Sequence, residues 1–151
     1  MNKNVFRKTI LFLVGFCLYI TIECLFRGYS YPLMGICGGI MMIILDTFNN
    51  QISWSMDILL QGCLGAVIIT LIEFIIGKSL KLLSLPPMWD YSNIPFNIDG
   101  IICLPFSLIW VLLSIIGIFI ADAINYYVFD ELPVPYYKLF GKIVLRFKKK
   151  I

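Results

Sequence analysis

The chain has 151 residues, of which 60% are hydrophobic and only 14% are charged, whereas a soluble domain carries about 25% charged residues. It contains no histidine, which excludes His-based acid/base catalysis, Ser-His-Asp and Cys-His nucleophiles and histidine metal ligands. The composition indicates an integral membrane protein.

The first apolar block, Thr9–Phe26, contains one charged residue, Glu23. A helix needs roughly 20 apolar residues to cross a bilayer, and this block has nearly that length. Lys3, Arg7 and Lys8 precede it, as basic residues precede a signal peptide. Because the block is too long for a signal peptide and no small-x-small cleavage site follows it, we expect an uncleaved membrane anchor.

Further apolar blocks follow over Pro32–Leu45, Ile58–Ile76 and Ile101–Ala121. The second block is short and spans a bilayer only if Asp46 reaches the headgroup level, so three spans with a re-entrant segment are the alternative. The sequence predicts an all-α polytopic membrane protein, with four transmembrane helices as two hairpins in a domain of residues 1–130. The expected spans cover about residues 6–26, 32–48, 57–77 and 100–122.

Basic residues flank both ends of this domain. Before the first span stand Lys3, Arg7 and Lys8, and after the last stand Lys138, Lys142, Arg146, Lys148, Lys149 and Lys150. Between the spans there are only Arg27, Lys78 and Lys81. The positive-inside rule therefore predicts that both ends lie in the cytoplasm, which requires an even number of spans. The connection between the second and third spans would face inward although it has no basic residues.

The segment 133–151 differs from the rest of the chain. Aromatic and aliphatic residues recur in it at helical spacing, at Tyr136, Tyr137, Phe140, Val144 and Phe147, while its lysines fall mostly elsewhere on the helical wheel. This pattern predicts a basic, cytoplasmic amphipathic tail, an interfacial helix on anionic lipid headgroups. A plain positive-inside anchor and a docking site for a soluble partner are the alternatives.

Two glutamates stand inside apolar blocks, where a carboxylate marks a candidate functional site. In the four-span arrangement, Glu23 and Glu73 both lie near the outer leaflet. Arg27 follows Glu23 by four residues, so the two side chains share one helix face and form a favourable pair. The alternative is that each glutamate only reaches the interface and ends a helix there.

The connection 78–100 is the only long polar segment between spans. It contains the aromatic and polar residues Trp89, Asp90, Tyr91 and Asn97. Such side chains serve as anchors at the membrane interface, or they could form the lid of a pocket between helices. Asp99 is the expected N-cap of the fourth span.

The same connection carries a family resemblance. Trp89–Ser92 and Phe96–Trp110 resemble the signature of the putative ABC-transporter type IV family, the CmpB-like small bacterial membrane proteins. Tyr19–Glu23, Arg27-Gly28 and Thr70–Gly77 are similar to further motifs of that family, so the resemblance covers roughly residues 15–114. The chain departs from the family pattern at Met88 and over Tyr31–Gly35. The resemblance implies a bacterial inner-membrane protein classed as a transporter permease.

The favoured hypothesis is a transport or channel component that is not an enzyme. Its candidate ligand or ion pathway comprises Glu23, Arg27, Glu73, Trp89, Asp90, Tyr91 and Asn97, with no catalytic residue, metal or cofactor. The expected partners are the lipid bilayer and either further copies of the chain or other membrane subunits, and nucleic acid is excluded. The alternatives are an accessory or scaffold protein that docks a partner through 78–100, and an intramembrane enzyme that acts on lipids.

Overall fold

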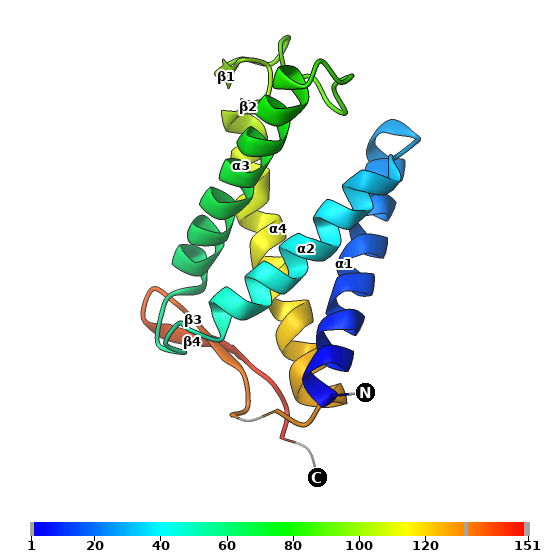
Figure 1. Cartoon of the computed structure of the whole chain (residues 1–151). Coiled ribbons are helices and arrows are strands. Elements are labelled where there is room, and N and C mark those ends of the chain that lie inside the picture. The colour runs from blue at the N-terminus through cyan, green and yellow to red at the C-terminus, as the bar shows by residue number, and fades with distance from the viewer. Residues whose placement is uncertain (1, 132, 150–151) are drawn as a thin grey trace. The chain divides into compact units, whose positions relative to one another are not determined.

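The computed structural model describes residues 2–131 and 133–149, so Lys150 of the basic tail lies outside the described residues. It is built from the helices α1 (Lys3–Arg27), α2 (Pro32–Asn49), α3 (Ile58–Leu82) and α4 (Leu104–Ala123) (Figure 1). A π-helical turn, η1 (Ile124–Val128), continues α4. Within the described part of the chain, four helices are long and apolar enough to cross a membrane. The expectation of four helices with the length and apolar composition of membrane spans is confirmed.

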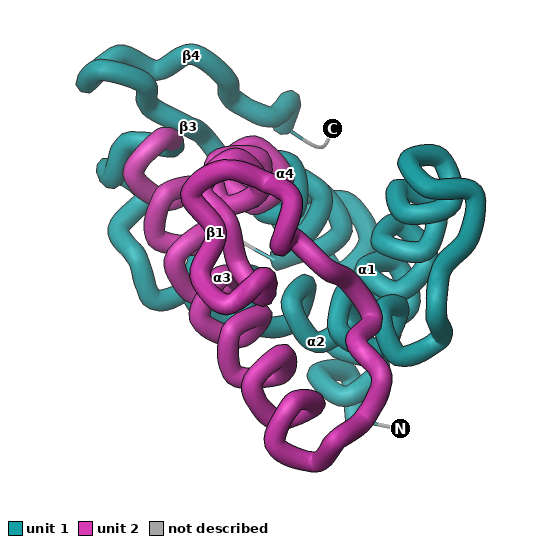
Figure 2. The backbone as a smooth tube through the Cα atoms, turned by 90° about the horizontal axis from the view of Figure 1, so that it is seen from above, with its two compact units in different colours: residues 1–58, 116–151 teal, residues 59–115 magenta. Residues whose placement is uncertain are grey.

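The chain divides into two compact units (Figure 2). Unit 1 comprises residues 1–58 and 116–151, and unit 2 comprises residues 59–115. The helix α4 contributes its first half to unit 2 and its second half to unit 1. Each unit therefore has its own packing, which is described separately below.

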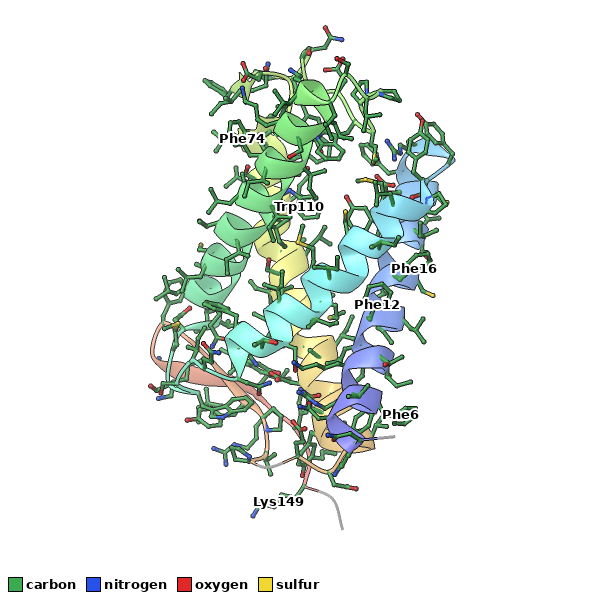
Figure 3. All side chains as sticks on the ribbon, in the orientation of Figure 1. Phe6, Phe12, Phe16, Phe74, Trp110 and Lys149 are labelled. Atoms are coloured by element: carbon green, nitrogen blue, oxygen red, sulfur yellow. The ribbon has the colours of Figure 1, made fainter. Side chains whose placement is uncertain are left out.

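Glycines allow α1 and α2 of unit 1 to pack closely. A Cβ atom on Gly15 would lie 2.6 Å from the carbonyl oxygen of Gly38, and one on Gly39 would lie 2.6 Å from the ring of Phe12, which is labelled in Figure 3. Small residues at such positions let helix backbones approach closely, and the resulting van der Waals packing is one of the forces that associate helices in lipid. A tight turn follows α1, where Gly28 adopts φ 81° as the C-cap.

The second half of α4 packs against this helix pair. Leu11, Met42 and Ala121 form the buried cluster of unit 1, one residue from each of α1, α2 and α4. Arg7, near the start of α1, also bonds to Asn125 in η1. The start of α1 and the turn that continues α4 therefore lie side by side in unit 1.

Unit 2 contains most of α3, the first half of α4 and the connection between them. Its two helices approach where Gly62 faces Ile115, and Thr70 donates a hydrogen bond of 3.3 Å to Ser107. The connection ends in a short antiparallel pair, β1 (Asn97–Ile98) and β2 (Ile102–Cys103).

The expected N-cap role of Asp99 is wrong. Asp99 and Gly100 form the turn between β1 and β2, with φ values of 55° and 65°. The fourth helix begins only at Leu104, after β2. The reason is the left-handed backbone at this turn, which glycine and aspartate tolerate better than most residues.

The expected amphipathic helix in the tail is also wrong, and the fold is not purely α. Residues Tyr136–Leu139 (β3) and Lys142–Arg146 (β4) form an antiparallel hairpin. Its two-residue turn, Phe140-Gly141, has φ values of 50° and 77°, which is the type I′ geometry that matches the twist of paired strands. Aromatic and β-branched residues on both sides of that turn favour strands over a helix.

We predict that Gly15→Leu destabilises unit 1 by about 1–3 kcal/mol, because the new side chain must displace the backbone of α2. The measurement is thermal or SDS-induced unfolding of the purified protein in detergent. Thr21→Leu, at an exposed position of the same helix, is the matched control and should change stability by less than about 0.5 kcal/mol. Equal stability of the two variants would contradict the packing described here.

Candidate functional site

The carboxylate of Glu73 is buried in unit 2, with 7% of the residue exposed. The indole N–H of Trp110, labelled in Figure 3, donates to Oε2 at 3.0 Å, and the hydroxyl of Tyr91 donates to Oε1 at 3.0 Å. Both donors are neutral groups. Among the described residues no Lys or Arg forms an ion pair with Glu73, so its carboxyl group is held by hydrogen bonds to neutral donors alone.

Tyr91 reaches Glu73 from the connection between α3 and α4. Its ring stacks on Phe106 with 4.7 Å between centroids, and its backbone N–H donates to the carbonyl of Gly100 at 2.8 Å. The side chain of Asn97 ties the same segment together, since it donates to the carbonyl of Ile94 at 2.8 Å and accepts from the N–H of Gly100 at 3.0 Å. These contacts hold the Tyr91 hydroxyl in position to donate to the Glu73 carboxyl group.

Trp89 and Asp90 line a cavity of about 190 Å³ in the same unit. The indole N–H of Trp89 donates to the carbonyl of Ile101 at 2.7 Å. Asp90 accepts the backbone N–H of Ser92 at 2.8 Å and also its hydroxyl, and this hydroxyl bond lowers the pKa of the Asp90 carboxyl. Trp89 therefore holds the loop in place, while Asp90 stays ionised beside the cavity.

Glu23 and Arg27 belong to unit 1 and pair as their spacing predicts. Nη2 of Arg27 lies 2.9 Å from Oε2 of Glu23, and the hydroxyl of Ser30 also donates to that oxygen. The guanidinium lies over the rings of Tyr29 and Tyr31, 4.8 Å and 5.6 Å from their centroids. Together with the bond from Ser30, this ion pair connects the end of α1 to the turn that leads to α2.

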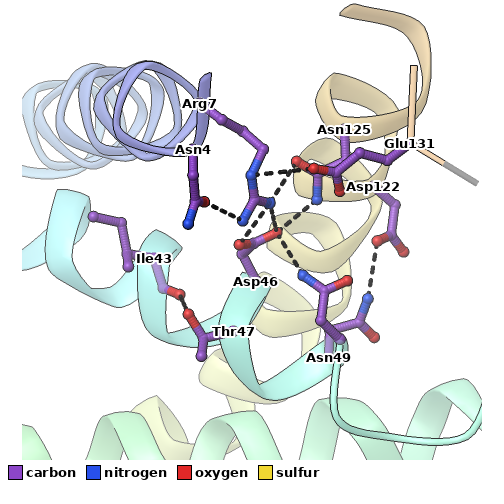
Figure 4. A network of polar contacts seen from close by, with 10 residues as sticks. Asn4, Arg7, Ile43, Asp46, Thr47, Asn49, Asp122, Asn125 and Glu131 are labelled. Carbon is purple, nitrogen blue, oxygen red and sulfur yellow. Dashed lines mark hydrogen bonds and ion pairs between the residues drawn. The ribbon is translucent and has the colours of Figure 1, made fainter. Parts of the chain in front are cut away.

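A second polar cluster, which we term the inner network, lies at the other end of unit 1 (Figure 4). Asp46 is only 1% exposed and Arg7 is 9% exposed. Nη1 of Arg7 lies 3.1 Å from Oδ2 of Asp46 and donates to Oδ1 of Asn125 at 3.0 Å. The amide of Asn125 donates to Oδ1 of Asp46 at 2.6 Å, and Nε of Arg7 lies 3.3 Å from Glu131. Arg7 and Asp46 are thus paired out of water, and Glu131 adds a second, more exposed carboxylate at the edge of the network.

The inner network continues to the C-terminal hairpin. Asp122, buried on α4, accepts from the amide of Asn49 at 2.9 Å and from the hydroxyl of Tyr137 at 2.6 Å. Burial raises the pKa of the Tyr137 phenol, and the Asp122 carboxylate adds to that effect, so the hydroxyl stays a donor. These bonds anchor β3 on the end of the helices.

Sequence reasoning missed the inner network as a candidate site. It used Arg7 only as a basic residue that predicts membrane orientation. It used Asp46 and Asp122 only as the charged residues that end the second and fourth apolar blocks. One signal was available: in an antiparallel four-span arrangement, the start of the first block and the ends of the second and fourth lie on the same side, so these charges meet there. The partners Asn49 and Asn125 carry no such signal, because nothing in the local pattern separates them from ordinary helix ends.

The comparisons with known proteins point to one family. A family model described as "Putative ABC-transporter type IV" matches residues 6–147. Neither a curated protein nor a solved structure matches the chain.

We predict that Arg7→Met destabilises the protein by about 3–5 kcal/mol, because it leaves the buried carboxylate of Asp46 without its cation. The measurement is SDS-induced unfolding in mixed micelles. Lys3→Met removes an exposed cation from the same helix and should cost less than about 1 kcal/mol. The double change Arg7→Met with Asp46→Leu should recover part of the loss; if it is no more stable than Arg7→Met alone, the pair is not the source of the effect.

Proposed function

We propose a transport role from one premise: the chain belongs to the family described as putative ABC-transporter type IV. In this proposal the chain is the membrane component of a transporter or channel, with a polar site at the outer side of the bilayer. The site includes Glu73 and the loop residues that surround it. Glu23 and Arg27 form the outer polar group of unit 1.

The observation that carries the proposal is the environment of Glu73. A carboxylate in a spanning helix is costly and marks an ion or substrate path by default. Glu23 and Asp46 each pair with a guanidinium, whereas the hydrogen-bond donors on Glu73 are the neutral indole and phenol. An acidic group without a cationic partner can bind a cation or a proton, so we propose a cation as substrate or coupling ion.

The chain would act together with other chains. It has no G-x-x-x-x-G-K-[ST] loop, so any ATP-driven transport needs a separate ATPase subunit. Four spans in a single copy are also few for a permease, which supports assembly with further copies or partner membrane subunits. We place both chain ends in the cytoplasm of a bacterial cell because the basic flanks follow the positive-inside rule.

The proposal predicts that Glu73→Gln abolishes cation uptake. Membrane vesicles from cells that produce the chain retain any partner subunits, and uptake of ⁸⁶Rb⁺, ²²Na⁺ and protons is measured with and without ATP. Vesicles with the wild-type chain should exceed vesicles without it for at least one cation. Glu73→Gln should return that uptake to background at equal membrane abundance, because it removes the charge but keeps the shape.

Tyr91→Phe is the matched control, since it removes a hydrogen bond to Glu73 but keeps the carboxylate. It should retain most of the uptake, whereas a purely structural role of Glu73 would make Tyr91→Phe and Glu73→Gln equally harmful. Wild-type uptake in the double variant Glu23→Gln with Glu73→Gln contradicts the proposal. So does background uptake of all the cations by the wild-type chain.

A further inference from the structure

The cavity in the outer loop has mixed walls. Leu80 and Lys81 from the end of α3 line one part of it, and Pro87, Met88, Trp89 and Asp90 from the loop line another. Its volume of about 190 Å³ corresponds to about six water molecules at liquid density. A group of this size is a small metabolite or a lipid headgroup, not a whole drug-sized ligand.

The cavity is lined by one positive and one negative side chain that can each form further hydrogen bonds. The Lys81 ammonium donates to the backbone carbonyl of Asp99, and an ammonium has further N–H donors. Both bonds from Ser92 to Asp90 end on Oδ1, so the second carboxylate oxygen retains acceptor capacity. The other lining carboxylate, Asp99, pairs with Lys78. The charges available to a ligand are therefore a positive Lys81 and a negative Asp90.

The length of α3 allows the cavity to lie at the height of lipid headgroups. The 25 residues of α3 extend over about 37 Å, which exceeds the hydrocarbon core of about 30 Å. The last turns of the helix, which hold Leu80 and Lys81, can therefore extend beyond the core. Leu82 and Leu83, directly after them, are exposed apolar side chains, as expected at the boundary with acyl chains.

We propose that this cavity binds a small zwitterion that carries an anionic phosphate and a primary ammonium, the chemistry of phosphoethanolamine. Lys81 binds the phosphate, Asp90 accepts hydrogen bonds from the ammonium, and the Trp89 ring and neighbouring apolar residues cover the carbon atoms between them. The ligand is either the headgroup of phosphatidylethanolamine or a free phosphoethanolamine-like compound. This inference rests on the proposed function, because it names a ligand class for the connection 78–100 on the proposed outer side. Binding of this ligand can be measured without any transport.

The test measures binding to the purified full-length protein in detergent. Native mass spectrometry compares phosphatidylethanolamine with phosphatidylglycerol, and calorimetry compares phosphoethanolamine with inorganic phosphate. We expect at least one of the ammonium compounds to bind tenfold or more tightly than its partner without an ammonium. Binding only in the lipid arm assigns the headgroup as ligand, and binding only in the soluble arm assigns the free compound.

Asp90→Asn should weaken binding of the ammonium compound at least tenfold, because it removes the negative charge. Asp57→Asn, a loss of the same charge outside the cavity, should leave binding unchanged. Leu85→Trp is a second variant that narrows the cavity without changing its charge, and it should also weaken binding. Equal binding of paired compounds, wild-type binding by Asp90→Asn, or no binding in either arm overturns the inference. Binding that persists in Glu73→Gln while uptake is lost separates the two proposals.

Discussion

The ion pair between Arg7 and Asp46 is the interaction on which unit 1 depends. Asp46 is buried within the protein, away from water, so its carboxylate must find its partners there. Asp46 finds one cation and two amides, because Arg7, Asn125 and Asn50 all reach it. This requirement joins α1, α2 and the end of α4, and through Asp122 and Tyr137 it also holds the C-terminal hairpin.

The same constraint acts differently on Glu73 in unit 2. Neutral donors satisfy its hydrogen bonds without supplying a counter-charge. Removing one partner of a buried ion pair leaves an uncompensated charge, so both members of such a pair are held in place. An intramembrane acidic group that has no cationic partner marks a candidate ion or substrate path instead. This difference is why the proposed function rests on Glu73 rather than on the larger inner network. The neighbouring cavity is where we propose that a small zwitterion binds.

The spanning helices follow from apolar block lengths, and the pair Glu23–Arg27 follows from helical spacing. The partners of Glu73 could not be predicted, because Tyr91 reaches it through a loop whose path depends on tertiary contacts. The C-terminal hairpin shows a different failure. The residues Tyr136–Phe147 satisfy a helical spacing by coincidence, and only the turn at Phe140-Gly141 shows that the segment folds back on itself.

Cysteine labelling with a membrane-impermeant maleimide in intact cells tests the central claim. That claim is that the connection 78–100, which covers Glu73, lies outside the cell and that the inner network lies inside. In a background that lacks the five native cysteines, a single cysteine is introduced at Asn93, Gln51 or Lys148. The account predicts that the cysteine at position 93 reacts in intact cells, and that those at positions 51 and 148 react only after permeabilisation. The reverse pattern, or reaction of all three in intact cells, would contradict it.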